Sequence, residues 1–508
     1  MHPDDKRRYT GALLLLGPAL GWFYAVKYTE QLSARPMADF YGLLKLTPEK
    51  PWLMVGAIGG LLLSAMAAYL LFYASSSAFE GQPYRRFIRG TRVASFSALV
   101  RKTRNKKVRQ VEIAGAPMPP DAEIRHTLVA GGTGTGKTVL FKGLAWSAMQ
   151  RGDRMIIADP NGEMYSLFGR PNDKIANPYD QRSVGWSIFN EIRDDYDFHR
   201  YALSLVPRGR SNAEEEWASF ARLLLRETAR KLVRENNPSI ERLIWWTTIA
   251  QPDQFKTFLT GTDAESLFTG ADKALASARF MLADKITEHK KMPPGEFSLR
   301  DWLDDPKGGN LFLTWNEAQA TALKPLISAW VDVLCTSILS LPASDDRKVW
   351  LFLDELASLE KLPSLEAALT KGRKAGLRVV AGLQSTSQLD KIYGHDEAQT
   401  LRSCFRTLAA LGGAMTDAKT SEDLSKSLGE HEVERYAYSR SSGEKGASTN
   451  KSLRTDRERV VMPSQITGWP DLTGYLAFVG NLPIAKFELC IQPFVAVNPP
   501  FVQRESAA

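Results

Sequence analysis

With 508 residues, the chain is too long for a single hydrophobic core, so we expect two or three domains. The net charge of +8 is modest for that length, and the distribution of charge along the chain says more than the total. Cys335, Cys404 and Cys490 lie far apart without CxxC spacing, which argues against a disulfide framework or a zinc site and fits a reducing cytosol.

Two apolar stretches lie before residue 75. The first spans 11–26, and the second, 52–73, has no charge and is long enough to cross the roughly 30 Å hydrocarbon layer as a helix. The first stretch alone resembles a signal peptide, but no convincing small-x-small cleavage site follows it. We therefore expect a transmembrane hairpin over 1–75, with a short outside loop at about 27–51.

Basic residues flank this hairpin on both sides. Lys6, Arg7 and Arg8 precede the first stretch, and the segment 81–111 after the second contains ten lysines and arginines and no acid. The positive-inside rule therefore places both termini in the cytoplasm. The basic segment also attracts anionic lipid, an interpretation that we prefer to a DNA contact.

A phosphate-loop motif follows at Gly131-Gly132-Thr133-Gly134-Thr135-Gly136-Lys137-Thr138, which fits G-x-x-x-x-G-K-[ST] without a mismatch. The glycines let successive backbone N–H groups point inward at phosphate oxygens. We expect Lys137 to reach the β- and γ-phosphates of ATP and the Thr138 hydroxyl to hold Mg²⁺. An apolar strand at 126–130 precedes the loop and an apolar helix follows it, so the helix dipole faces the phosphates.

Apolar strands alternate with helical segments from about residue 121 onward. After the phosphate loop, strands are expected at 155–158, 311–314, 349–353, 377–381 and 407–411. Continuous apolar strands separated by helices are typical of a parallel sheet covered on both faces. Such an α/β fold binds its ligands at the carboxyl ends of the strands, where these motifs lie.

Two segments interrupt the alternation. Between 184 and 297 the strand signal disappears, and amphipathic helices are expected at 217–236, 238–249 and 272–289. We expect an all-α domain over 184–297, inserted in a nucleotide-binding domain made of 76–183 and 298–508. Its role is open between a lid and a module that contacts DNA or a partner. The polar segment 436–459, rich in Ser, Gly, Lys and Arg, predicts a mobile loop.

The apolar strand at 349–353 ends in two acids, Asp354 and Glu355. Asp354 is expected to hold Mg²⁺, directly or through water, and Glu355 to polarise the attacking water as a general base. Two acids after a strand are common in proteins, but behind a complete phosphate loop they indicate ATP hydrolysis.

Three further positions are candidates for the site. Gln384 follows the strand expected beside the acids, where it can touch the γ-phosphate or its water; a polar residue at the strand's surface end is the alternative. Arg373 ends the helix after the acids and is a candidate arginine finger for a neighbouring subunit, although a basic residue favours a helix C-terminus in any case. Asp159 and Glu163 either serve the site or shape a turn.

Taken together, these motifs resemble those of a known family. They are the phosphate loop, Asp159-Pro160-Asn161-Gly162-Glu163, Phe352-Leu353-Asp354-Glu355-Leu356, Gly382-Leu383-Gln384-Ser385 and Met462-Pro463-Ser464-Gln465-Ile466, behind two apolar spans. The set is similar to the type IV coupling proteins of the TrwB/TraD class, most of all to the TrwB type, over nearly the whole chain. Asn161 stands where the family often has Lys, which weakens a charge role there.

The resemblance implies a RecA-like motor that is a homohexamer when active and is anchored in the bacterial inner membrane. It implies that ATP and Mg²⁺ drive relaxase-bound DNA, without strong sequence preference, to a type IV secretion channel during conjugation. The relaxase and the secretion components come from the resemblance alone.

Two other functions remain open. An FtsK-like DNA translocase shares the motor and the anchor but would normally carry more spans, a long linker and a winged-helix tail. A docking receptor that binds ATP without hydrolysing it would not need the water-activating Glu355. An ABC-type ATPase would need an L-S-G-G-Q-like signature between the two nucleotide motifs, and the sequence has none.

Overall fold

The structure, a computed structural model, describes residues 3–29, 42, 44–45, 47–70, 78–268, 272–443 and 446–505. Contacts divide the chain into two compact units, Met1–Val93 with Glu430–Val460 and Ala94–Gly429 with Val461–Ala508. The second unit includes both the nucleotide motifs and the segment 184–297. The domain boundaries given above therefore stay a prediction.

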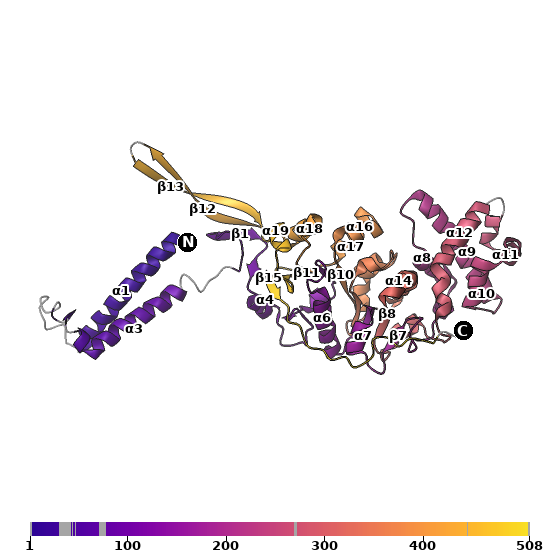
Figure 1. Ribbon diagram of the computed structural model, residues 1–508, viewed down its shortest axis with the longest axis horizontal. Helices are drawn as coiled ribbons and strands as arrows, with labels where there is room; N and C mark the ends of the chain where they lie inside the picture. The colour runs from indigo at the N-terminus through magenta and orange to yellow at the C-terminus, as the bar shows by residue number, and fades with distance from the viewer. Residues whose placement is uncertain are drawn as a thin grey trace. The chain divides into compact units, whose positions relative to one another are not determined.

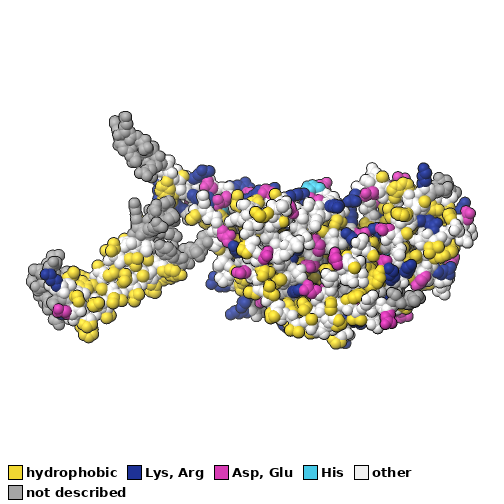
Figure 2. All heavy atoms as spheres, viewed as in Figure 1, with side chains coloured by type: hydrophobic (Ala, Val, Ile, Leu, Met, Phe, Trp, Pro, Cys, Tyr) yellow, Lys and Arg dark blue, Asp and Glu magenta, His cyan; other side chains and the backbone are white. Residues whose placement is uncertain are grey.

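In the first unit, two apolar helices, α1 (Pro3–Thr29) and α3 (Pro51–Ala68), pack side by side (Figure 1). Their contact is so close that a Cβ added to Gly60 would lie 2.1 Å from the carbonyl oxygen of Gly17. Hydrophobic side chains cover most of the surface of the pair (Figure 2). Tyr9–Thr29 and α3 are long and apolar enough to cross a membrane, as the predicted hairpin requires.

The first unit also contains a three-stranded antiparallel sheet. Its strands are β1 (Arg86–Gly90), β12 (Glu430–Gly443) and β13 (Gly446–Arg459), in the order β1-β12-β13. The prediction of a mobile loop at 436–459 is therefore wrong. The two strands pair along their length, and at their base Glu430 lies opposite Arg459 and forms a 2.6 Å ion pair with Arg457. Facing opposite charges stabilise a hairpin that has few apolar residues.

A mostly parallel sheet forms the core of the second unit. Its strands include β5 (Thr127–Ala130), β6 (Arg154–Pro160), β7 (Lys174–Ala176), β8 (Leu311–Trp315), β9 (Val349–Leu353), β10 (Leu377–Leu383), β11 (Thr407–Leu411), β14 (Thr473–Ala477) and β15 (Ile484–Glu488). They follow the order β15-β14-β11-β5-β10-β9-β6-β8-β7, with β14 and β15 antiparallel at one side. Every strand expected from an apolar run is present, and the predicted α/β fold is confirmed.

Alternate side chains of these strands enter two cores, one on each face of the sheet. Leu351 of β9 belongs to the core that includes α14 (Ala320–Ser340). Its neighbour Phe352 belongs to the opposite core, which includes α6 (Lys137–Arg151). The segment Glu317–Ser340 is apolar enough to cross a membrane but is 72% buried, so α14 is a core helix.

The segment 184–297 is helical, and none of its described residues forms a strand. Its main helices, gathered together in Figure 1, are α8 (Asp195–Leu205), α9 (Asn212–Arg234), α10 (Ile240–Ile244), α11 (Pro252–Leu259) and α12 (Asp272–Ile286). Leu224 and Leu232 of α9 belong to the same core as Trp330 of α14. The helical segment is therefore continuous with the core on that face of the sheet.

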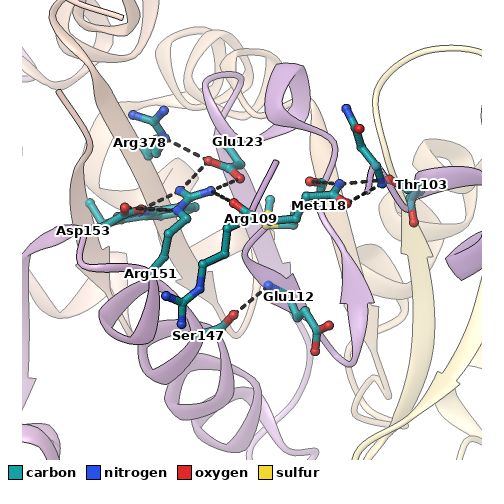
Figure 3. Close-up of polar contacts among 12 residues, drawn as sticks. Thr103, Arg109, Glu112, Met118, Glu123, Ser147, Arg151, Asp153 and Arg378 are labelled. Atoms are coloured by element: carbon teal, nitrogen blue, oxygen red, sulfur yellow. Dashed lines mark hydrogen bonds and ion pairs between the residues drawn. The ribbon is translucent and has the colours of Figure 1, made fainter. Parts of the chain in front are cut away.

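A buried ionic network holds the far end of α6, the helix that starts at the phosphate loop (Figure 3). Arg151 donates to both carboxylate oxygens of Glu123 at 2.7 Å and to Asp153 at 3.0 Å. Glu123 also accepts from Arg378 of β10 at 3.2 Å, and Asp153 accepts from the Trp350 indole of β9 at 2.7 Å. The Arg151 side chain is only 8% exposed. Because these charges are buried and paired, they fasten α6 to the amino ends of two central strands.

Candidate functional site

The phosphate loop lies between β5 and α6, at the carboxyl edge of the sheet. Gly134 and Gly136 have φ values of 80° and 107°, a left-handed backbone that strongly favours glycine. The N–H of Gly132 donates to the carbonyl of Gly412 at 2.7 Å, and the N–H of Gly413 donates to Ile466 at 3.1 Å. The loop after β11 thus joins the phosphate loop to the Met462–Ile466 motif. Sequence reasoning missed this support, and the signal for it was the glycine pair that follows an apolar strand.

Lys137 is 8% exposed and lies within the loop itself. Its ammonium donates to the carbonyl oxygens of Gly131 and Gly132, both at 2.9 Å. Burial lowers the pKa of Lys137, and the carboxylates of Glu355 and Asp354 act in the opposite direction. The lysine charge therefore lies between the loop carbonyls and the acid pair.

Thr138 and Asp354 meet at the start of α6. The Thr138 hydroxyl donates to Oδ2 of Asp354 at 3.3 Å, while the buried Oδ1 has no hydrogen-bond partner. Burial raises the pKa of Asp354, and the hydroxyl of Thr138 and the charge of Lys137 counteract that rise. A hydroxyl and a carboxylate are the hard oxygen donors that Mg²⁺ takes, usually with only one or two protein carboxylates. Among the described residues no cluster of three acids, histidines or cysteines offers a fuller cage.

Glu355 lies next to this pair at the end of β9. Neither of its buried carboxylate oxygens has a partner in full hydrogen-bond geometry. Burial raises the pKa of Glu355, and the charge of Lys137 is the largest opposing influence. A buried acceptor without a partner costs free energy, so the site is built to receive a donor from outside the chain.

Gln384 follows β10 and reaches the phosphate loop. Its amide oxygen accepts from the Thr133 hydroxyl at 3.2 Å, and its side chain is near enough to Glu355 to counteract the rise in the pKa of that acid. The structure thus brings together the loop, Thr138, Asp354, Glu355 and Gln384.

Arg373 is not part of that group. It lies exposed in the short helix Gly372–Ala375, directly before the amino end of β10. The seven residues of β10 separate that end from Gln384, which is on the order of 20 Å at about 3.3 Å per residue. Arg373 therefore cannot contact the phosphate loop of its own chain.

Asp159 and Glu163 lie at the turn after β6 and line a small cavity together with Thr138 and Asp354. The Asp159 carboxylate accepts from the backbone N–H groups of Met164 at 2.9 Å and Tyr165 at 2.8 Å, and burial raises its pKa to about 7. Glu163 forms an ion pair with Lys142. Between the two acids, Asn161 has a φ of 62° and its N–H donates to the carbonyl of Trp315 at 2.6 Å. Asparagine tolerates this left-handed backbone better than lysine does, so Asn161 suits the turn.

Comparisons with known proteins agree with this architecture. A family model described as the type IV secretion-system coupling protein DNA-binding domain matches residues 110–490. The coupling protein TraD of Escherichia coli (strain K12) is 32% identical over 413 residues, which are 78% of this chain and 56% of TraD. The chain thus spans little more than half the length of that relative.

Two solved structures extend the comparison. The plasmid coupling protein TrwB in complex with the non-hydrolysable ATP analogue ADPNP is 60% identical, with 84% of this chain and 100% of TrwB covered and a TM-score of 0.79. TrwB in complex with ADP and Mg²⁺ is 61% identical, with the same coverage and a TM-score of 0.78.

Proposed function

The chain belongs to the type IV secretion-system coupling proteins, and we propose that it is a membrane-anchored hexameric ATPase that drives DNA transfer in bacterial conjugation. In this proposal it brings relaxase-bound DNA to a type IV secretion channel and moves it by hydrolysing ATP. One observation carries the proposal: the residues that ATP hydrolysis needs converge at the carboxyl edge of the sheet, where the buried Glu355 carboxylate has no partner in full hydrogen-bond geometry.

Each residue of the site has a role in the proposed reaction. Lys137 pairs its charge with the β- and γ-phosphates of ATP, and Thr138 and Asp354 hold Mg²⁺, which when bound neutralises phosphate charge. Glu355 accepts a proton from the attacking water on a carboxylate oxygen, and its raised pKa makes it a stronger base than an exposed glutamate. Gln384 positions that water from its place between Thr133 and Glu355. The ADPNP and ADP–Mg²⁺ complexes of TrwB support ATP and Mg²⁺ as the ligands.

Arg373 has a place in this scheme only across a subunit boundary. Its exposed position at the amino edge of the sheet lets it meet the γ-phosphate bound by the next subunit of a ring. The role therefore rests on the proposed homohexamer.

The two apolar helices anchor the protein in the bacterial inner membrane. Basic residues outnumber acids on the segments that flank them, which supports cytoplasmic termini and a contact with anionic lipids. The relaxosome and the components of the secretion channel are the proposed protein partners.

The proposal is tested with the full-length protein in lipid nanodiscs, by measuring ATP hydrolysis with and without DNA. We expect hydrolysis that DNA stimulates, and Glu355→Gln should bind nucleotide but lose turnover because only the water-activating charge is removed. Glu216→Gln, at an exposed position of α9, is the matched control and should keep turnover. Nucleotide binding without any hydrolysis in the wild type would favour the docking receptor. Plasmid transfer that persists in a Glu355→Gln strain would contradict the role in conjugation.

A further inference from the structure

A cleft of about 830 Å³ opens beside the nucleotide site. Its lining comes from residues within 206–218 and 281–285 of the helical segment, from Lys324 of α14, and from residues within 355–361 and 384–392. Glu355 and Gln384 form part of its wall, but no residue of the phosphate loop does. The cleft is therefore a separate site that touches the two residues proposed to handle the attacking water.

Positive charge dominates the cleft. Its wall contains six cations against four acids, and the cations are Arg208, Arg210, Lys285, Lys324, Lys361 and Lys391. Lys285 is paired with Glu360, and Lys361 with Glu397 at 2.7 Å. Within the described part of the chain, Arg208, Lys324 and Lys391 form no ion pair.

Lys324 lies close to two other lysines of the cleft. Burial lowers the pKa of Lys324, the charge of Glu360 opposes this shift, and the charges of Lys285 and Lys391 add to it. Lys285 and Lys391 are thus both close enough to Lys324 to repel its charge. An anion that entered the cleft would relieve this repulsion.

The rest of the lining indicates which kind of anion fits. No aromatic side chain is among the described residues of the wall, so bases have no stacking surface there. The volume is within the roughly 300–1,000 Å³ of pockets that enclose small ligands, which allows a short stretch of one strand. A cleft that binds through positive charge alone fits the regularly spaced phosphates of a nucleic-acid backbone and does not distinguish the bases.

A short helix links the cleft to the nucleotide site. α16 (Thr386–Tyr393) carries Lys391 near its end and begins two residues after Gln384. The backbone carbonyl of Lys391 accepts from Arg210 at 3.0 Å, and the amide of Gln384 accepts from Thr133 of the phosphate loop at 3.2 Å. A ligand that displaced α16 would therefore also shift Gln384.

We propose that this cleft binds the phosphate backbone of a single DNA strand through Arg208, Lys324 and Lys391, and that α16 conveys its occupancy to Gln384. The inference rests on the proposed function, because it names how DNA stimulates hydrolysis. DNA held in the cleft repositions Gln384 and thereby the water beside Glu355.

The test uses full-length protein in nanodiscs and a single-stranded oligonucleotide of mixed sequence. One variant combines Arg208→Gln, Lys324→Gln and Lys391→Gln; its matched control combines Arg234→Gln, Lys256→Gln and Lys290→Gln, three exposed cations of the helical segment. Binding of DNA is measured from 50 to 200 mM salt, together with ATP turnover and nucleotide affinity. Lys391→Gln alone, at an exposed position, covers the case in which the triple variant fails to fold.

For the cleft variant we expect the salt exponent of DNA binding to fall by about 2, since each phosphate contact on a single strand contributes about 0.7. The DNA concentration that half-saturates ATP turnover should rise on the order of tenfold, while nucleotide affinity and the control variant stay as in the wild type. Lys391→Gln alone removes one of the three proposed phosphate contacts, so its salt exponent should fall by about a third as much.

If DNA binding and DNA-stimulated turnover were the same in the cleft variant and its control, the cleft would not be the DNA site. The proposed function would stand. Loss of nucleotide affinity instead of DNA response would assign the cleft to ATP, and competition by polyglutamate as strong as that by DNA would assign it to an acidic protein. Either result overturns the inference. A wild-type protein whose turnover ignores DNA would overturn the proposed function and the inference together.

Discussion

Replacing Arg151 with Met should loosen α6 and, through it, the phosphate loop. The substitution keeps the length of the side chain but leaves Glu123 and Asp153, which are 2% and 3% exposed, without their shared cation. Breaking a buried ion pair from one side costs about 3–5 kcal/mol. Glu123 keeps Arg378 and Asp153 keeps the Trp350 indole, so we expect the lower end, about 3 kcal/mol.

Native-state hydrogen exchange on peptides from α6 measures this loss locally, which avoids a global two-state assumption for a chain with two units. A cost of about 3 kcal/mol should speed exchange of the protected amides roughly 150-fold. The control is Lys426→Met, which removes a helix-surface ion pair with Glu422 whose side chains are 60% and 40% exposed. Such a pair contributes about 0.3–0.5 kcal/mol, so exchange should barely change. An Arg151→Met protein whose α6 exchanges less than about fivefold faster would refute the fastening role.

Two further outcomes follow from the site, and a third from His126, a buried histidine directly before β5 that accepts a hydrogen bond from the N–H of Val379 at 3.0 Å. Lys137→Ala should abolish hydrolysis and plasmid transfer while the membrane-inserted protein stays folded; normal turnover would remove the phosphate loop from the mechanism. Arg373→Ala should bind ATP but lose DNA-stimulated turnover, and mixing it with Glu355→Gln subunits should restore some activity, because one interface then holds an intact acid beside an intact arginine. If mixed rings form but stay inactive at every ratio, Arg373 does not act as an arginine finger for the neighbouring subunit. Burial lowers the pKa of His126 to about 4, from about 6.5 in the unfolded chain. The neutral histidine therefore contributes its full stability above about pH 6.5, and this contribution falls as the pH drops toward about 4. Lowering the pH from about 7 to about 5 should cost about 2 kcal/mol at this residue, and His126→Gln should remove that part of the pH dependence of thermal unfolding; an unchanged pH dependence would show that His126 titrates normally.

The sequence predicts the α/β sheet well because each central strand is buried on both faces and therefore reads as an unbroken apolar run. It also predicts the phosphate loop and the acid pair, since both depend on short segments with fixed local geometry. These residues converge because the carboxyl ends of parallel strands share one edge of the sheet.

Contacts between distant segments could not be predicted in the same way. Glu123 and Arg378 are far apart in the sequence, and no local pattern marks them as partners. The hairpin formed by β12 and β13 was missed because its strands pair along their length without an apolar run, whereas composition alone suggested a loop. The cleft beside Glu355 likewise combines cations from five separate segments.

The pairing of β1 with β12 has a consequence for how the chain is made. Gly90 lies beside His431 in the finished sheet, so roughly 340 residues must leave the ribosome between the two strands, which takes roughly 20–70 s at 5–20 residues per second. Throughout that interval β1 follows two newly made apolar helices without its neighbour in the sheet. Its Arg86 and Arg89, with Arg85 just before it, make this solitary strand a poor template for pairing with another nascent copy. The arginines would thus disfavour such pairing during synthesis, before Arg89 forms its 2.7 Å ion pair with Glu432.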